Sequence, residues 1–350
     1  MAQARRVSAI IKYDNKDISA SLMPYVKSIS YRDAMSGQAD DLQITLEDRA
    51  GLWQSAWMPE LGATLDVSLV TENWQDAGML PQALRLGTFE LDEITSTGYP
   101  SEAQLKAVSV PFNNTLRGEE HTRSWEKAEL KTIANDIATA AELELFFDTD
   151  YNPTIERAEQ TEQSDLSFFL ALCGDYGLAL KISSGQLIIF DEAMYEAAEA
   201  VITIVKPGTL YTAIGNVIYL PAMLGYSFTR KLRDVYAACH VKYQQGQNKA
   251  LIEATFTAPG KTGKTLQVQE QVENTADAER LAKKRLREKN CDEVTGSLTL
   301  PGCFFLVAGI TVNMLGFGAY DGKYIITETQ HNIGSGYTTG INVRRCLDGY

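Results

Sequence analysis

Residues 61–69 read Leu61-Gly62-Ala63-Thr64-Leu65-Asp66-Val67-Ser68-Leu69, and residues 86–94 read Leu86-Gly87-Thr88-Phe89-Glu90-Leu91-Asp92-Glu93-Ile94. The same design returns near the other end of the sequence, where Ala308-Gly309-Ile310-Thr311-Val312-Asn313-Met314-Leu315 precedes Asp321-Gly322-Lys323-Tyr324-Ile325-Ile326-Thr327-Glu328. Each copy reads as a strand, a loop, a glycine turn and a long alternating strand. Self-similarity of this kind can decide an architecture, and two copies favour a ring-building protein that places similar β modules side by side.

The closing parts of the two copies also match. The turn at 97–100 corresponds to the turn at 334–337, and the strand at 105–108 corresponds to the strand at 341–343. We therefore expect an α+β fold, mainly β, with a first β-barrel domain at 1–112 and an α/β insertion domain at 113–200. A second β-barrel domain is expected at 201–350, with a helical excursion at 275–289.

Composition limits the class of protein. The 350 residues suffice for two or three domains, and 45% hydrophobic and 22% charged residues are near the globular average. The formal charge of −13 argues against a general binder of nucleic acids or anionic membranes, because neutralising phosphates needs clustered Lys and Arg. The basic run at 283–287 is best explained as the solvated face of a helix.

The five cysteines, Cys173, Cys239, Cys291, Cys303 and Cys346, are scattered and odd in number. This distribution predicts reduced, mostly buried thiols rather than a disulfide framework. No apolar run approaches the ~20 residues that span a bilayer, and the N-terminal segment is too polar for a secretory signal. We expect a soluble protein made in the cytoplasm.

Three helices are predicted from hydrophobic spacing and caps. The first follows Ser124, with Leu130, Ile133, Ile137 and Ala141 on one face; the second runs from Ser164-Asp165 to Gly174; and the third runs from Thr275, its cap, to Lys289. In the third, Ala278, Leu281, Ala282 and Leu286 form the buried stripe. Strands are expected at 7–13, 26–32, 41–47, 226–230, 237–243 and 249–256, and a hairpin at 178–190. We expect Trp53, Trp57, Phe168, Phe169 and Leu172 in the core.

Two segments imitate ligand sites. Residues 258–265 (Ala258-Pro259-Gly260-Lys261-Thr262-Gly263-Lys264-Thr265) resemble a P-loop, but Ala258 occupies the position of the required first glycine, so a polar hairpin tip is favoured. Residues 148–159 imitate the spacing of an EF-hand. Pro153, however, occupies the position that must adopt positive φ, so an ordinary acidic turn is favoured over calcium.

Catalytic chemistry finds little support in the sequence. His121, His240 and His331 lie far from one another and from cysteine pairs, which favours structural or surface roles. The chain has many carboxylates, so their number leaves open a glycosidase pair such as Glu119 or Glu120 with Asp148. Nothing in the sequence, however, places those carboxylates across a cleft. We predict no catalytic, cofactor-binding or metal-binding residue, no cofactor and no enzyme activity.

Several motifs together resemble the late control D or baseplate hub family of contractile-tail phages and related injection systems. They comprise the helix from Thr275, the segments 296–302, 309–312, 321–327 and 331–339, and, in the middle, Arg123-Ser124-Trp125 and the stretches 164–170 and 174–178. The resemblance covers most of the chain and is most specific in the C-terminal part.

The resemblance implies a structural hub protein of the virion tail baseplate, assembled in the host cytoplasm. Both barrel domains would resemble the tail-tube subunit, so that a homotrimer presents six similar barrels to the hexameric tail tube and threefold symmetry to the central spike. Its partners would be the tail tube protein, the spike and other baseplate proteins. DNA would only pass through the channel, and no membrane insertion is expected. We hypothesise that the negative charge lines the channel and repels DNA phosphates.

Two alternatives stay open. The chain could be the hub of a contractile bacteriocin or secretion machine, through which no DNA passes. A different class of function is a tail-associated cell-wall hydrolase, which the missing catalytic constellation makes the weaker hypothesis.

Overall fold

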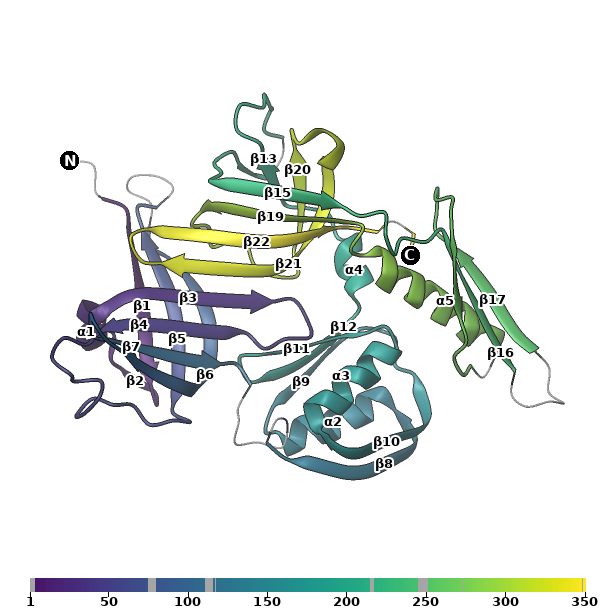
Figure 1. Cartoon of the computed structure of the whole chain (residues 1–350), viewed down its shortest axis with the longest axis horizontal. Helices are drawn as coiled ribbons and strands as arrows, with labels where there is room; N and C mark the ends of the chain where they lie inside the picture. Colours follow the sequence, from purple (N-terminus) through teal and green to yellow (C-terminus); the bar gives the residue numbers. More distant parts are fainter. Residues whose placement is uncertain are drawn as a thin grey trace. The chain divides into compact units, whose positions relative to one another are not determined.

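A computed structural model of the chain describes residues 4–74, 80–110, 116, 118–214, 217–244, 251–272, 274–347 and 349–350 (Figure 1). The chain divides into two compact units. Unit 1 comprises residues 1–191, 300–308 and 328–340, and unit 2 comprises residues 192–299, 309–327 and 341–350. Strands dominate both units, so the expectation of a mainly β fold is confirmed.

The N-terminal part of unit 1 forms one antiparallel sheet. Its strand order is β2-β1-β5-β6-β7-β4-β3, and the second half of β21 pairs with the outer edge of β3. The strands are β1 (Arg6–Tyr13), β2 (Lys16–Asp17), β3 (Val26–Ala34), β4 (Asp41–Glu47), β5 (Thr64–Glu72), β6 (Gln82–Thr97), β7 (Glu102–Val108) and β21 (Gly322–Ile333). Between β2 and β3 lie the short helices α1 (Ser19–Leu22) and η1 (Met23–Tyr25).

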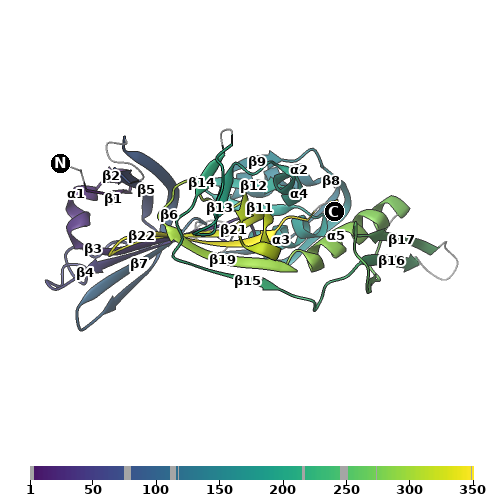
Figure 2. The ribbon, with the colours of Figure 1, turned by 90° about the horizontal axis from the view of Figure 1, so that it is seen from above.

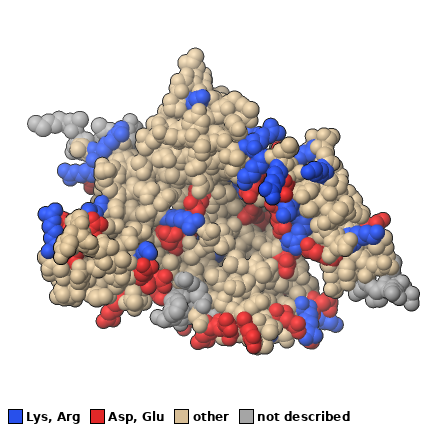
Figure 3. All heavy atoms as spheres, in the orientation of Figure 1, with Lys and Arg blue, Asp and Glu red and all other residues tan. Residues whose placement is uncertain are grey.

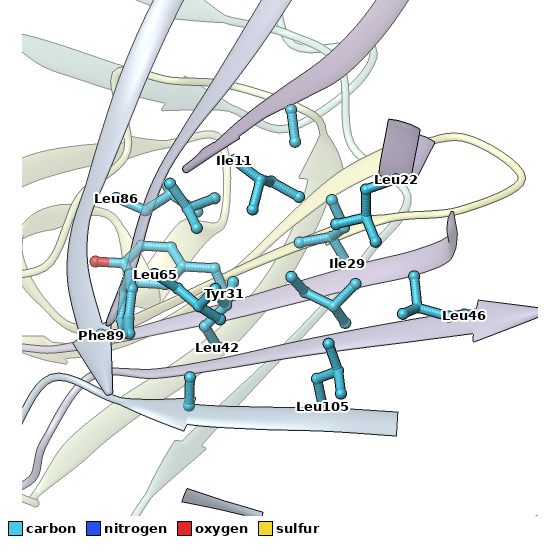
Figure 4. Close-up of a cluster of buried hydrophobic side chains, with 14 of the residues drawn as sticks. Ile11, Leu22, Ile29, Tyr31, Leu42, Leu46, Leu65, Leu86, Phe89 and Leu105 are labelled. Atoms are coloured by element: carbon cyan, nitrogen blue, oxygen red, sulfur yellow. The ribbon is translucent and has the colours of Figure 1, made fainter. Parts of the chain in front are cut away.

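Strict alternation of apolar and polar residues produces this sheet. In β4, β5 and β7 every second side chain is buried, so each strand offers one face to a core and one to its surroundings. The buried faces meet around Ile11, Leu65 and Phe89, and the Tyr31 ring lies edge-on to Phe89 (Figure 4). Trp53 joins this core, as predicted. The prediction was wrong for Trp57, which caps Tyr25 and Trp53 edge-on and remains 44% exposed.

The rest of unit 1 is an α/β arrangement with its own core. Its elements are β8 (Glu120–Glu129), α2 (Leu130–Ala140), β9 (Glu144–Asp148), β10 (Thr154–Ser164), α3 (Asp165–Asp175), β11 (Ala179–Ser183) and β12 (Gln186–Phe190). Strands β8 and β10 form an antiparallel ribbon, while β9, β12 and β11 form a second sheet. The predicted hairpin is therefore confirmed as β11 and β12, joined at Ser184 and Gly185, which both have positive φ.

The predicted start of the first helix was wrong. Residues 120–129 form β8, and the helix begins at Leu130. Pairing with β10 overrides the helical spacing, because it sets Trp125 opposite Ala158 on the buried face of the ribbon. The second helix begins as predicted, since the Ser164 hydroxyl accepts a hydrogen bond from the Ser167 amide.

The residues of the motif at 123–125 do not start a helix; their side chains pack at the edge of the α/β core. Arg123 forms an ion pair with Asp165, the fully buried first residue of α3. The Arg123 guanidinium lies 5.0 Å from the centre of the Trp125 ring, and that ring stacks on Phe168 at 5.3 Å. Phe168, Phe169 and Leu172 are buried, as predicted.

The remaining strands of the same 14-stranded sheet lie mainly in unit 2, and we call them the second sheet. Their order is β14-β13-β20-β21-β22-β19-β15. Its members are β13 (Ile202–Val205), β14 (Ile218–Leu220), β15 (Gly225–Arg230), β19 (Val294–Pro301), β20 (Thr311–Leu315), the first half of β21, and β22 (Tyr337–Arg345). The short helices α4 (Glu192–Ala197) and η2 (Gly318–Tyr320) complete this part of the unit.

The two sheets repeat each other strand by strand. The order β5-β6-β7-β4-β3 in unit 1 corresponds to β20-β21-β22-β19-β15 in unit 2, and the corresponding strands follow the same order along the chain. The flanking strand differs in direction, because β1 is antiparallel to β5 whereas β13 is parallel to β20.

The register of the repeat is also the same. Leu65 pairs with Phe89 and Val67 with Gly87, while the equivalent residues pair as Val312 with Tyr324 and Met314 with Gly322. The Gly62 amide donates to the Leu91 carbonyl at 2.9 Å, and the Gly309 amide donates to the Ile326 carbonyl at 2.8 Å. The internal similarity in the sequence therefore corresponds to an internal repeat in the structure.

Unit 2 also carries a small α/β module between β15 and β19. It contains β16 (Ala238–Gln244), β17 (Leu251–Thr257), β18 (Thr265–Val268) and α5 (Thr275–Asn290), which packs on β16 and β17 (Figures 1 and 2). Ala278, Ala282 and Leu286 are buried as predicted. The cap of α5 is Asn274 rather than the predicted Thr275, because the Asn274 side chain accepts from the Asp277 amide.

The prediction of a hairpin tip at 258–265 was wrong. Strand β17 is antiparallel to one edge of β16, and β18 is parallel to the other edge. The P-loop-like segment therefore crosses from one side of β16 to the other. It is held by an ion pair between Lys261 and Glu293, so this lysine already has an anionic partner.

Candidate assembly surfaces

A long segment of unit 2 carries no charge. Between Lys206 and Arg230 the sequence contains no Asp, Glu, Lys or Arg, and 13 of these 23 residues are hydrophobic. In a water-soluble domain such a segment is normally buried. In the described part of this one, however, Leu210 is 98% exposed, Ile214 is 71% exposed and Leu224 is 63% exposed. We call residues 207–229 the uncharged segment.

Local contacts hold the uncharged segment in place. It leaves β13, crosses the short edge strand β14 and enters β15. Tyr211 and Tyr219 stack with ring centres 5.0 Å apart, and the Tyr226 ring packs edge-on against Phe317 at 5.1 Å. Gly316 has positive φ and lies so close to Thr209 that no other side chain would fit there. In the described parts of the segment, 207–214 and 217–229, the exposed side chains therefore lie next to residues that have defined packing contacts.

The exposed apolar area is large enough for a protein contact. Val201, Leu210, Tyr211, Ile214, Leu224 and Tyr226 are all between 40% and 98% exposed. At roughly 200 Å² for each such side chain, they present on the order of 700 Å² of surface. A standard interface buries about 800 Å² on each partner, which is comparable with this summed area. This surface fits a role as a binding face for another protein.

The charge of the chain is unevenly distributed. Residues 113–200 contain 18 Asp and Glu but only six Lys and Arg, a formal charge of −12. Residues 1–112 carry −6, and residues 201–350 carry +5. Acidic side chains gather along the lower edge of Figure 3, where Figure 1 draws β8 and β10. The two regions with duplicated sheets thus have opposite charges.

A buried ionic cluster joins the α/β part of unit 1 to the sheet. Lys181 of β11 pairs with Asp33 at the end of β3, and its ammonium lies 3.4 Å from Asp40. The Ser109 hydroxyl donates to the Ile182 carbonyl at 3.0 Å. These bonds fix β11 beside the β3–β4 loop. Burial raises the pKa of Asp40 to about 6, although the Lys181 ammonium opposes this shift.

The buried His331 lies at the junction between β21 and β3. It pairs with Tyr31, its ring stacks on the Tyr31 ring at 6.1 Å, and Nδ1 lies 2.8 Å from the Tyr337 hydroxyl. Burial lowers the pKa of His331 to about 4. The prediction of a structural role agrees with this packing.

Asp40 and His331 should affect acid stability in opposite directions. Between about pH 4 and 6.5 the unfolded chain protonates His331 while the folded chain does not, so this histidine lowers stability as the pH falls. Asp40 takes up a proton in the folded state below about pH 6, so it raises stability over the same range. We expect Asp40→Asn to remove the contribution that offsets the histidine. Between pH 6.5 and 4 the free energy of unfolding of the variant should fall by roughly 2–3 kcal/mol more than that of the wild type. Urea unfolding across this range checks it, and parallel pH profiles for the two proteins would contradict it.

The other residues considered for chemistry are dispersed. His240 Nδ1 lies 2.8 Å from the Thr255 hydroxyl, and His121 lies 3.8 Å from Glu119. Glu120 opens β8 and Asp148 ends β9, in two different sheets. In the EF-hand-like segment, the Asn152 side chain accepts from the Lys131 amide and donates to Glu129. Within the described ranges, no three His, Cys, Asp or Glu residues are grouped as a metal site.

Burial raises the thiol pKa of several of the cysteines. None of the five forms a disulfide, and burial raises the pKa of Cys173 to about 12 and that of Cys239 to about 11. A cavity of about 250 Å³ beside Cys291 and Cys346 is smaller than a usual ligand site, and its charged residues include the paired Lys261 and Glu293. Across the described residues, no helix is both long and apolar enough to cross a bilayer.

The uncharged segment was missed by the sequence reasoning. Its signal was present, since 23 consecutive residues without charge are unusual in a chain that is 22% charged. Hydrophobic residues alone do not show exposure, however, and only the structure separates this segment from a core strand. The concentration of acidic residues in 113–200 was also readable from the sequence.

The fold is similar to that of solved phage tail proteins. A tail protein from Neisseria meningitidis MC58 superposes with a TM-score of 0.70 at 12% identity, covering 98% of this chain and 97% of that one. The 43 kDa tail protein of prophage MuSo2 from Shewanella oneidensis gives a TM-score of 0.70 at 12% identity, covering 97% and 99%. A type VI secretion system component from E. coli gives 0.56 at 11% identity, covering 99% and 78%.

In sequence, the chain resembles baseplate hub proteins. It is 26% identical over 180 residues to the "Probable baseplate hub protein" of Escherichia phage P2, and 25% identical over 180 residues to the protein of the same name from Escherichia phage 186. The match spans 51% of this chain but only 44% of the P2 protein and 43% of the 186 protein. No family model matches the chain. These findings confirm the resemblance to baseplate hub proteins that the motifs indicated.

Proposed function

We propose that this chain is a structural hub protein in the baseplate of a contractile phage tail. Three copies form a ring that joins the hexameric tail tube to a trimeric spike, and the protein has no enzymatic role. The observation that carries this proposal is the duplicated sheet, with the same strand order and register in both copies. The sequence similarity to baseplate hub proteins supports the same role.

Symmetry explains why duplication would serve a hub. A ring of six identical subunits needs the same contact surfaces at each step of 60°, whereas a spike of three chains needs steps of 120°. A chain with two similar sheets satisfies both, because three copies provide six sheets. We propose that each sheet takes the place of one tail-tube subunit and that the ring encloses the channel.

The uncharged segment suits the contact between copies in such a ring. Its exposed side chains would leave water on assembly, and it carries no charge that would have to be desolvated. The alternative, a hub of a secretion machine, shares this requirement. The likeness in fold to the type VI component is compatible with that alternative.

Charged substitutions in the uncharged segment should block assembly without unfolding the chain. For Leu210→Asp combined with Ile214→Asp we expect self-association to weaken at least 100-fold, because two exposed apolar side chains would carry charge into the contact. The free energy of unfolding of the monomer should change by less than about 0.5 kcal/mol per site. Leu80→Asp, at a side chain that is 82% exposed in unit 1, is the control. Sedimentation velocity measures the self-association of the double variant and of the control. Equal association of the two would contradict the assignment.

The proposed function is tested by the mass of the purified protein under native conditions. A species of three times the 38.6 kDa chain supports the hub. A monomer at micromolar concentration would count against it. A zymogram on purified peptidoglycan addresses the hydrolase alternative, and a clear lytic band would replace the structural role with an enzymatic one.

A further inference from the structure

We propose that the chains of the ring are joined by strand pairing between β6 of one copy and β15 of the next. The partner is a second copy of this chain, and the paired residues are 93–97 of β6 and 227–230 of β15, followed by Lys231. This inference rests on the proposed function, which assigns the contact between copies to the uncharged segment. It specifies the strand pairing within that contact, since residues 227–229 belong both to the uncharged segment and to β15.

The first step is that β3 and β15 are equivalent strands. Tyr31 of β3 packs against Phe89 with ring centres 5.9 Å apart, and Phe228 of β15 packs against Tyr324 with ring centres 5.8 Å apart. Phe89 and Tyr324 are equivalent positions of the repeat. Tyr31 therefore corresponds to Phe228, which also aligns Ser30 with Ser227 and Arg32 with Thr229.

The second step is a junction that forms within one chain. Beyond Ile326, β21 leaves β20, and its residues 328–333 pair with β3. Gln330 lies opposite Arg32, and Asn332 lies opposite Ser30. Side chains reinforce this pairing, since the Ser30 hydroxyl donates to Asn332 at 2.8 Å and the Arg32 guanidinium donates to Glu328 at 2.5 Å. The long strand of the second sheet thus extends onto the first sheet.

The third step is that both strands of the equivalent junction have free edges. Beyond Leu91, β6 leaves β5, and residues 93–97 pair on one side only, with β7. Strand β15 pairs on one side only, with β19. Within the residues that the structure describes, no strand lies on the other side of either segment. The repeat therefore contains one complete junction and the two separate halves of a second.

Transferring the register from the first junction to the second gives specific neighbours. Residues of β21 and β6 differ by 235 in number, so Thr95 would lie opposite Thr229, Thr97 opposite Ser227 and Glu93 opposite Lys231. Hydroxyl pairs and an opposite-charge pair are favourable cross-strand neighbours. The basic residues Arg230 and Lys231 would meet the acidic residues Asp92 and Glu93.

The regional charges agree with this arrangement. The first sheet belongs to a region of charge −6, and the second belongs to a region of charge +5. Alternation of the two around a ring brings opposite charges together at every junction, whereas contacts between identical sheets would oppose like charges. Because each chain offers one free β6 edge and one free β15 edge, the contact is head-to-tail, and three copies close into a ring when it rotates each chain by about 120°.

Cysteine pairs test this contact. The background carries Cys291→Ser, which removes the half-buried thiol, while the other four cysteines are buried. Two matched variants are made in this background: Thr95→Cys with Thr229→Cys, and Thr97→Cys with Ser227→Cys. Directly opposed side chains on paired strands lie within reach of a disulfide. Mild oxidation should convert more than half of each matched variant to covalent dimers and trimers, with no larger species. The mismatched control, Thr95→Cys with Ser227→Cys, is shifted by two residues and should cross-link at least tenfold more slowly.

A charge exchange provides a second measurement that does not depend on oxidation. Lys231→Glu should weaken association about tenfold, and the double variant Glu93→Lys with Lys231→Glu should restore it, while Lys16→Glu serves as the control. A native trimer that cross-links in neither matched variant and shows no rescue would overturn the strand pairing but leave the hub proposal standing. A wild-type protein that stays monomeric would overturn both.

Discussion

Replacing Glu196 by alanine should lower the free energy of unfolding by about 3–5 kcal/mol, the largest loss that we expect from a single substitution. Glu196 lies on α4 and is 3% exposed. Its carboxylate pairs with Arg344 of β22 and with Arg287 of α5 at 2.5 Å, and it accepts the Leu347 amide at 2.9 Å. Alanine would remove the buried partner of Arg344, which is itself 5% exposed and also forms an ion pair with the more exposed Glu192 at 2.7 Å.

The ionic contacts of Glu196 tie three separate stretches of unit 2 together. α4 precedes the second sheet, α5 belongs to the inserted module, and β22 is the last strand. Glu199→Ala, an exposed carboxylate three residues away, is the matched control and should change stability by less than about 0.5 kcal/mol. Urea unfolding followed by circular dichroism measures both variants. Equal losses in the free energy of unfolding for the two variants would show that the ionic network does not hold these elements together.

Replacing Gly302 by alanine should destabilise unit 1 by about 3 kcal/mol, at the upper end of the range for overpacking. A methyl group at this position would lie 1.9 Å from Cδ1 of Tyr337. The ring cannot move aside easily, because it packs against Trp74 at 5.3 Å and Phe304 at 5.6 Å. The indole of Trp74 also donates to the Gly302 carbonyl at 2.6 Å, so a shift of the backbone would break that bond.

Gly336→Ala is the control for this clash. Gly336 lies in the turn before β22, and a methyl group there would meet no atom within 4 Å. We expect its effect to be smaller than about 1 kcal/mol, and near-ultraviolet circular dichroism should show altered aromatic packing for Gly302→Ala only. Equal thermal midpoints for the two variants would contradict the packing of Tyr337 described here.

The sequence was most informative where a pattern is local. The Ser164 cap predicted the start of α3, and the turn at Ser184-Gly185 predicted the β11–β12 hairpin, because each signal acts over a few residues. The repeat was visible for the same reason, since glycine turns and alternating strands occur in the same order twice. Only the structure showed that the two copies of the repeat share the same strand order and register.

Errors arose where distant pairing decides local structure. Residues 124–129 could continue a helix, yet β10 pairs with them from about 30 positions further along the chain. The segment 258–265 was taken for a hairpin tip because its neighbours are consecutive strands, while β16 actually lies between those two strands. Local propensity cannot foresee which strand will occupy an edge.

The candidate surfaces could be predicted only in part. Counting charged residues by region would have found the acidic insertion and the uncharged segment. Exposure of Leu210 and Ile214 depends on β14 being an edge strand, and the free edges of β6 and β15 depend on strand order. These properties belong to the fold rather than to any stretch of sequence.

The most direct test of the central claim is electron cryomicroscopy of the purified protein. If the chain is a hub built from a duplicated sheet, the images should show a closed ring of three chains in which six sheets are related by rotations of about 60°. A ring of three chains in which the two sheets of each copy are not related in this way, or a particle with a single chain, would contradict the account.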